Sequence, residues 1–237
     1  TDTLVAGDKV KVVVQMSEPV FLSGDGGNPS YTINLGDSNK TATYVSGLGS
    51  NTLVFTYTIT ANDIDLSGGV SAGSEALNLP DGSALQDPAE NDANLTTPAP
   101  STNTVSVDAV SPVFITTQLT ANENSTVVGT VEVTDDSAIT DYQLAGDDAD
   151  LFSITDAGVL AFRAAQNYES PSDMGNDGEY NITVIATDAA GNNTSQTVTV
   201  QLQNVNETPT LTSEIEDTTA TVNLSFTLDI SRNFSDP

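Results

Sequence analysis

The stretch TVIATDAAGNNTSQTVTVQLQNVNETPT, residues 183–210, contains the pattern of two β-strands and a linker. Apolar and polar residues alternate through YNITVIA (180–186) and TVTVQL (197–202), which is the period of a strand with one face buried. Between these runs, Asp, Gly and Asn supply the residues that turns favour. Oxygen-bearing side chains therefore gather where the predicted strands end.

The same alternation recurs along the chain, in KVKVVVQM (9–16), TLVFTYTI (52–59) and GTVEVT (129–134). Long helical periodicity is absent, and only short helical turns are expected, near 149–152 and 63–66. The pattern predicts an all-β chain of tandem Greek-key β-sandwiches. The predicted buried faces comprise Leu53, Phe55, Tyr57 and Ile59, then Tyr180, Ile182, Val184 and Ala186, then Val198, Val200 and Leu202.

Two segments have the form of a strand, a few polar residues and a proline: TVSVDAVSPVF (104–114) and QLQNVNETPT (201–210). Proline limits the bending of such a linker. We therefore predict a first domain at 1–108, a second at 109–207, and the incomplete start of a third at 208–237. About 30 residues cannot close a sandwich of their own. The tail offers Val222, Leu224, Phe226, Leu228 and Ile230 on one face.

The composition excludes several classes of function. The chain has 33 acidic and 5 basic residues, a formal net charge of −28, and no Cys, His or Trp. Nucleic acid and anionic membranes are poor partners for such a chain, because both need clustered Lys and Arg. Thiol catalysis, histidine bases and the usual zinc sites are impossible. The basic residues, which we expect to form no patch, are Lys9, Lys11, Lys40, Arg163 and Arg232.

The excess of negative charge repels itself, and divalent cations are the obvious neutralising partners. Adaptation to salty surroundings, or plain solubility, explains the large net negative charge equally well. The lack of cysteine favours a bacterial exterior over a disulfide-bearing secreted domain. No signal peptide and no membrane-spanning run is present, so membrane insertion is not expected. The chain is expected to be a segment of something longer.

The second predicted domain resembles a bacterial cadherin-like repeat. The residues that carry this resemblance are ANENSTVVGTVEVTDDSAITDYQLAGDDADLFSITDAGVLAF (121–162), NYES (167–170), ATDAAGN (186–192) and NVNETP (204–209). The first domain resembles the bacterial Ig-like repeats of large surface adhesins, through AGDKVKVVVQMSEPV (6–20) and ATYVSGLGSNTLVFTYTITANDIDL (42–66). The tail, 211–237, looks like the opening of another cadherin-type domain. Arrays of this kind are common in RTX-type adhesins, which implies a bacterial cell-surface protein active in adhesion and biofilms.

Calcium binds six to eight oxygen ligands, which this sequence supplies in abundance. Local calcium loops of the EF-hand and G-G-x-G-x-D types are absent, so any site must be assembled from distant segments. The resemblance implies two such sites at domain ends. The first would comprise Asp108, Asp135, Asp136 and Asp188. The second would comprise Glu123, Glu169, Asn204, Asn206, Glu207 and, from the tail, Asp236. The alternative, that these are turn residues and surface charge, stays open.

Other acids are weaker candidates. Glu18, Asp63 and Asp65 would form an ion site at one end of the first domain, although solvated loop acids are the simpler interpretation. The run GDDAD (146–150) is expected to be a solvated loop.

Three functions follow as hypotheses. The first is a calcium-rigidified spacer of a surface adhesin, whose partners are neighbouring domains of the same chain. The second is a ligand-binding module for glycans or surface proteins, in which Tyr31, Tyr44, Tyr142 and Tyr168 line a groove. The third, a two-carboxylate glycosidase, has no supporting pocket motif, so no enzymatic activity is expected.

Overall fold

The computed structural model describes residues 3–24, 26–72, 76–96, 105–216, 219, 221–223, 225 and 227–235. These residues are almost entirely strands, turns and loops, which confirms the predicted all-β class. The chain divides into two compact units, here called unit 1 and unit 2. Unit 1 comprises Thr1–Val113, Thr134–Thr140 and Thr187–Thr194, and unit 2 comprises Phe114–Val133, Asp141–Ala186 and Ser195–Pro237.

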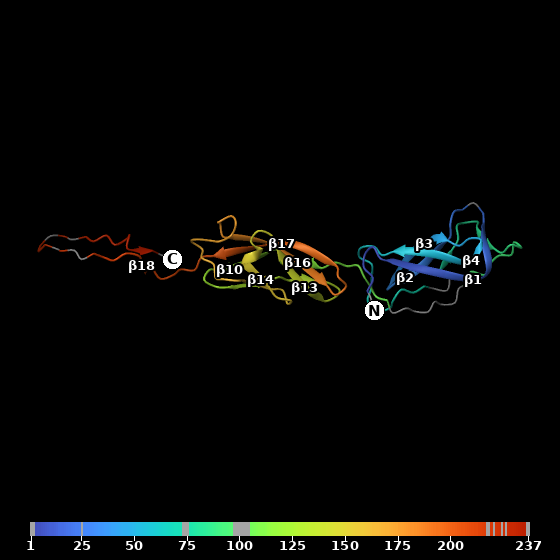
Figure 1. Ribbon diagram of the computed structural model, residues 1–237, viewed down its shortest axis with the longest axis horizontal. Helices are drawn as coiled ribbons and strands as arrows, with labels where there is room; N and C mark the ends of the chain where they lie inside the picture. The colour runs from blue at the N-terminus through green and yellow to red at the C-terminus, as the bar shows by residue number, and fades with distance from the viewer. Residues whose placement is uncertain are drawn as a thin grey trace. The chain divides into compact units, whose positions relative to one another are not determined.

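Unit 1 is built on a six-stranded sheet with the order β6-β2-β3-β4-β1-β7. Figure 1 shows its long strands β3, β4 and β1 side by side. Strand β1 pairs with β4 as far as Gln15, is irregular up to Val20, and then pairs with β7. The strands are β1 (Lys9–Ser23), β2 (Ser30–Leu35), β3 (Ser38–Ser46), β4 (Ser50–Thr58), β6 (Leu77–Asn78), β7 (Ala84–Gln86), and the separate pair β5 (Ile64–Asp65) and β8 (Val107–Asp108).

The core of unit 1 forms on the face that the alternation predicted. Leu53, Phe55 and Ile59 are at most 1% exposed, and the ring of Phe55 lies 5.6 Å from Tyr31 and 5.9 Å from Tyr44 between centroids. Tyr57 is only half-buried, because its hydroxyl reaches a polar network described below.

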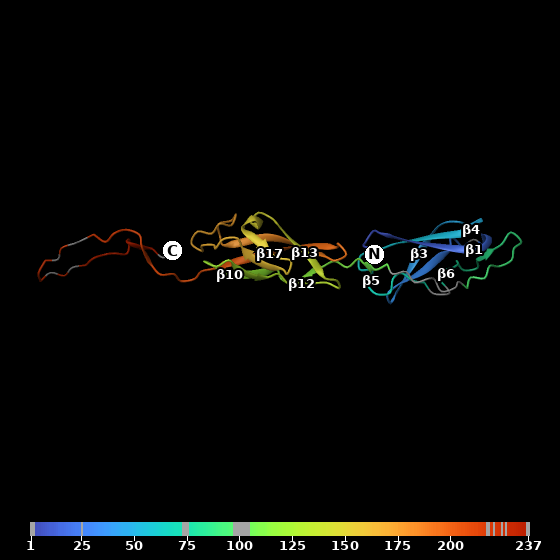
Figure 2. The same ribbon diagram turned by 60° about the horizontal axis from the view of Figure 1, so that its bottom comes forward.

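Unit 2 packs a four-stranded sheet, β10-β17-β16-β13, against a three-stranded one, β11-β15-β14. Figures 1 and 2 show β10 and β17 as neighbours, and they pair in parallel. The elements are β10 (Gln118–Asn122), β11 (Val127–Thr130), β13 (Ile139–Ala145), β14 (Phe152–Ile154), β15 (Val159–Phe162), β16 (Glu179–Asp188), β17 (Asn193–Gln203), a 3-10 turn (Ala149–Leu151), and the short pair β9 (Val113–Phe114) and β12 (Val133–Thr134).

Alternation again selects the core of unit 2. Every residue of the two predicted faces on β16 and β17 is at most 1% exposed. Phe152, Phe162 and Tyr180 pack as an aromatic cluster between the two sheets, with the Phe152 and Phe162 rings 4.4 Å apart. The helical turn predicted at 149–152 is confirmed, whereas the one predicted at 63–66 is wrong, because residues 64–65 pair with β8.

The tail forms one short pair, β18 (Thr210–Leu211) with β19 (Phe234–Ser235). Leu224 and Phe226 of the predicted apolar strand lie outside the described residues, and Val222, Leu228 and Ile230 belong to no strand. An alternating sequence becomes a strand only where a neighbour satisfies its backbone. Among the described residues, no helix has the length and apolar character needed to span a membrane.

Candidate metal centres

Three aspartates converge within unit 1, whose segments Thr134–Thr140 and Thr187–Thr194 include the ends of β12 and β16. Asp108 ends β8, Asp135 follows β12 and Asp188 ends β16, and one carboxylate oxygen from each lies within 4.8 Å of the others. Asp108 and Asp188 are 1% and 2% exposed, and Asp135 is half-buried. Strand ends place all three, as the sequence pattern indicated. We call this group the aspartate cluster.

Asp188 is fixed by its own loop. Its Oδ1 accepts hydrogen bonds from the backbone N–H groups of Ala190, Gly191 and Asn192, at 2.7–2.9 Å. The side-chain Nδ2 of Asn192 donates to Asp188 Oδ2 at 2.8 Å and to the carbonyl of Asp108 at 3.0 Å. The D-A-A-G-N segment therefore holds one carboxylate rigid and ties it to the backbone of a second ligand candidate.

Two oxygens of the aspartate cluster lack a hydrogen-bond partner. Asp108 Oδ2 and Asp135 Oδ1 are buried and accept no hydrogen bond from the described residues. Their sister oxygens do accept hydrogen bonds: Asp108 Oδ1 from the Val110 N–H at 3.3 Å, and Asp135 Oδ2 from the Ser137 hydroxyl at 3.0 Å. A buried, unpartnered carboxylate oxygen is costly, and a bound cation would offset that cost.

The electrostatics of the aspartate cluster agree with that reading. Burial raises the pKa of the Asp108 carboxyl above its ordinary value; hydrogen bonds from Ser137 and Val110 lower it in part, and the negative charges of Asp188 and Asp135 raise it again. Like charges this close disfavour each other's ionised form. A divalent cation among the three oxygens reverses the sign of this interaction, since it attracts every carboxylate.

Three glutamates converge in unit 2. Oxygens of Glu123, Glu169 and Glu207 also lie within 4.8 Å of one another. Glu123 is 2% exposed, and its two oxygens accept hydrogen bonds from the N–H groups of Tyr168 and Val205, both at 2.8 Å. Glu123 therefore connects the segment of Glu169 with the segment of Glu207. We call this group the glutamate cluster.

Amides surround the glutamate cluster. Asn204 Nδ2 donates to Glu169 Oε1 at 2.7 Å, and Asn124 Nδ2 donates to Glu207 Oε1. Asn206 Nδ2 donates to the carbonyl of Glu207 at 3.3 Å. Every acidic oxygen here has a partner or access to solvent, so the glutamate cluster is a less demanding cation site than the aspartate cluster.

Two predicted ligands stand apart. Asp136 is exposed and belongs to neither cluster; it lies in the bend after β12, where Asp135 is the half-buried residue. Asp236 lies outside the described residues. Sequence reasoning missed Asn124 and Asn192. The signal for Asn192 was its place four residues after Asp188, which is a turn-forming spacing.

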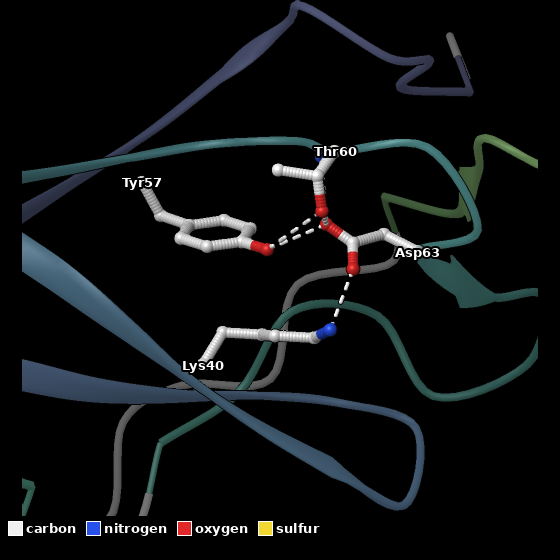
Figure 3. A network of polar contacts seen from close by, with 4 residues as sticks. All are labelled: Lys40, Tyr57, Thr60 and Asp63. Atoms are coloured by element: carbon white, nitrogen blue, oxygen red, sulfur yellow. Dashed lines mark hydrogen bonds and ion pairs between the residues drawn. The ribbon is translucent and has the colours of Figure 1, made fainter.

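The weaker acidic candidates have other partners. Figure 3 shows Lys40, Tyr57, Thr60 and Asp63 in one network. Asp63 Oδ1 lies 2.6 Å from Lys40 Nζ, and Asp63 Oδ2 accepts hydrogen bonds from the Tyr57 hydroxyl at 2.6 Å and the Thr60 N–H at 2.8 Å. A lysine thus occupies the place where a cation was predicted. Among the described residues, no close group of three acids includes Glu18, Asp63 or Asp65.

Asp65 and Asp148 organise loops. Asp65 is buried and accepts hydrogen bonds from the N–H groups of Gly36 and Gly68. Asp148 is 5% exposed and accepts them from Met174 and Asn181. The prediction of a solvated GDDAD loop is therefore wrong for Asp148, because the backbone N–H groups of two other segments need an acceptor there.

Replacing Lys40 by methionine is expected to destabilise unit 1 by about 1–3 kcal/mol, since it leaves the carboxylate of Asp63 buried without its cation. Burial alone would raise the pKa of Asp63, but hydrogen bonds from Lys40, Tyr57 and Thr60 outweigh it and lower the pKa. A lowered pKa means that this stabilisation is present above the unfolded value of about 3.9 and is lost as pH falls through the folded value.

Urea unfolding from pH 7 downward measures this effect. The difference in unfolding free energy between the native chain and Lys40→Met should shrink as the pH falls below about 4. A difference that stays constant to the lowest pH would contradict the role given to the ion pair. Lys11→Met, which removes a lysine that has no ion pair among the described residues, is the matched control.

Comparison with known proteins gives likenesses of fold. No family model and no curated protein matches the sequence. Among solved structures, the third cadherin domain of human protocadherin 7 is 15% identical, with a TM-score of 0.31 over 40% of this chain and 87% of its own. Mouse cadherin-23 EC22-24 is 15% identical, with a TM-score of 0.35 over 81% of this chain and 67% of its own. Drosophila N-cadherin EC1-3 is 13% identical, with a TM-score of 0.35 over 79% of this chain and 68% of its own.

Proposed function

We propose that this chain is a calcium-rigidified spacer or adhesion segment of a large bacterial cell-surface adhesin, without enzymatic activity. The observation that supports this most directly is the pair of buried, unpartnered carboxylate oxygens on Asp108 and Asp135. The sequence resemblance to adhesin repeats supplies the biological setting. Its partners are then the neighbouring domains of the same long chain, in an extracellular location.

The donor set of the aspartate cluster fits calcium. Hard carboxylate oxygens are the ligands that calcium prefers, and the chain has no thiol or imidazole that would favour a softer metal. Asp108, Asp135 and Asp188 would hold the ion, with the carbonyl of Asp108 kept in position by Asn192. These residues lie far apart in sequence, so an ion shared among them would fasten three segments together and stiffen the chain.

Calorimetry and solution scattering test the proposal. Calcium titrated into the chelated chain should release or absorb heat with a dissociation constant near the range of extracellular modules, about 10⁻⁴ to 10⁻³ M. The maximum dimension from small-angle scattering should change when a chelator is added. No binding heat at millimolar calcium, or scattering curves that superimpose, would refute the spacer mechanism.

Asp108→Asn should have effects of opposite sign with and without calcium. In chelator the neutral amide removes a buried charge whose pKa is raised, so unfolding free energy should increase by an amount on the order of 1 kcal/mol. In calcium the same change removes a ligand, so stability should fall below that of the native chain. Chemical denaturation in both buffers measures both signs, and a loss of stability in chelator would count against the repulsion described here.

The competing proposal, a binding groove lined by tyrosines, has less support. Tyr31 and Tyr44 pack on Phe55 in the core of unit 1, and Tyr142 packs against the core of unit 2. Only Tyr168 is exposed, at 44%. Three of the four rings are therefore used for folding, and we do not propose a tyrosine-lined site.

A further inference from the structure

One face of the sheet in unit 1 has an unusual combination of side chains. On β1, Val10 and Val12 pack against the core, so Lys9 and Lys11 project from the opposite face and are exposed. The five basic residues were expected to form no patch; two of them, Lys9 and Lys11, share this face, because residues two apart on a strand point the same way. They bring two of the chain's five positive charges together.

Hydroxyl groups continue from the lysines across the sheet. The strand registers align Lys11 with Thr56, Thr56 with Thr43, and Thr43 with Ser30. In the next row, Lys9 aligns with Thr58. We call the surface formed by these six residues the hydroxyl face: Lys9, Lys11, Ser30, Thr43, Thr56 and Thr58. Side chains directly opposite on neighbouring strands lie about 5 Å apart, and those two residues apart on one strand about 7 Å.

The hydroxyl face lacks the negative charge that dominates the rest of the chain. Glu18 is the one acidic residue in β1, β2, β3 and β4, all of whose residues are described, and it lies in the stretch between Gln15 and Val20 where the β1–β4 register is interrupted. Asp8 and Asp37 flank the strand ends. Among the described residues, the ammonium groups of Lys9 and Lys11 form no ion pair. The two lysines are therefore available to an outside anion.

The exposed face of the large sheet in unit 2 provides a comparison. Its strands also carry many Thr, Asn and Gln residues, as strands generally exclude acids. It nevertheless includes Asp141 and Glu179, and β10, β13, β16 and β17 contain no Lys or Arg. Lysines therefore accompany the rows of hydroxyl side chains on the hydroxyl face, but not on the large sheet of unit 2.

We propose that the hydroxyl face binds an acidic polysaccharide whose anionic groups are widely spaced among hydroxyls. Thr and Ser hydroxyls both donate and accept, which suits sugar hydroxyls, and Lys9 and Lys11 pair with carboxylates or sulfates. The flanking Val13 and Val45, 53% and 56% exposed, offer apolar contact to the faces of sugar rings. Charge complementarity selects this partner, because elsewhere a polyanion meets a surface of carboxylates.

Nucleic acid fits the hydroxyl face less well. Every nucleotide carries a phosphate, and binding requires many clustered Lys and Arg residues, whereas this face has two lysines and the chain carries a net charge of −28. A polysaccharide with one anionic group per disaccharide carries fewer negative charges than nucleic acid, so the carboxylates of the chain repel it less. Screening at physiological ionic strength limits the repulsion from distant carboxylates to about 8 Å.

Hyaluronate oligosaccharides, which have one carboxylate per disaccharide, are the probe, and dextran is the neutral control. Binding is measured by NMR titration of the full chain in chelator, so that calcium cannot bridge two carboxylates. Hyaluronate is expected to bind weakly and to shift the signals of β1, β3 and β4. The double variant Lys9→Gln/Lys11→Gln should weaken binding by about three- to tenfold. Thr43→Glu, which introduces an acid into the hydroxyl row, should abolish it.

The matched control is Arg163→Gln/Arg232→Gln, which makes the same change in net charge elsewhere and should leave binding unchanged. Four outcomes would overturn the proposal: no binding of hyaluronate, equal binding of dextran, equal loss in the control, or tighter binding of single-stranded DNA. Because the hyaluronate titration is done in chelator, a lack of hyaluronate binding leaves the calcium proposal intact. A lack of calcium binding likewise does not affect how the hyaluronate titration is interpreted.

Discussion

Calcium is expected to raise the free energy of unfolding by about 2.7 kcal/mol for each site when its concentration is a hundredfold above the dissociation constant. The ion binds the folded clusters and not the unfolded chain, where the three carboxylates of each cluster are far apart. At a single calcium concentration the gain should be larger for the aspartate cluster, which is expected to bind more tightly, since its Asp108 and Asp135 oxygens have no other partner. Urea unfolding in calcium and in chelator, followed by circular dichroism, measures the difference.

Single substitutions separate the two clusters. Asp135→Asn should remove most of the gain assigned to the aspartate cluster, and Glu169→Gln should remove the smaller gain of the glutamate cluster, where Glu169 is exposed. Magnesium is the ion control, because its preference for octahedral geometry and for keeping water suits clusters built from flexible loops poorly. Unfolding midpoints that are identical in calcium and chelator would rule out both sites.

Phe152→Ala is expected to destabilise unit 2 by about 3–5 kcal/mol, which is the usual range for removing a buried phenylalanine ring. Phe152 is fully buried, and its ring centroid lies 4.4 Å from that of Phe162 and 5.8 Å from that of Tyr180. The two remaining rings cannot both move into the cavity, because each is fixed in a different strand. Denaturant unfolding of the variant gives the free-energy difference directly.

Val159→Ala is the control for this prediction. Val159 also lies in the three-stranded sheet, but its side chain is 45% exposed, so the change should cost no more than about 0.5 kcal/mol. If the two variants lost equal stability, the aromatic cluster would not be the centre of the core of unit 2.

Local pattern predicted the strands and their buried faces. Strict alternation in 180–186 and 197–202 corresponds to side chains at most 1% exposed on β16 and β17. Alternation works here because a strand's side chains point to opposite faces in turn, whatever its neighbours are. The same rule failed for the tail, where Val222, Leu228 and Ile230 alternate yet belong to no strand among the described residues. Among the described residues of the tail, only Thr210–Leu211 and Phe234–Ser235 pair as strands.

The sequence by itself determined the chemistry: an all-β chain rich in hard oxygen ligands, without thiol or imidazole. The resemblance to cadherin-like repeats had already grouped Asp108, Asp135 and Asp188, which the structure brings together. Only the tertiary structure decided that Asp136 stays exposed and that Asp63 pairs with Lys40. The physical reason is that strand order, not sequence distance, sets which strand ends are neighbours. Pairing across the sheet likewise placed Lys11 beside Thr56, 45 residues away, where no local pattern could indicate it.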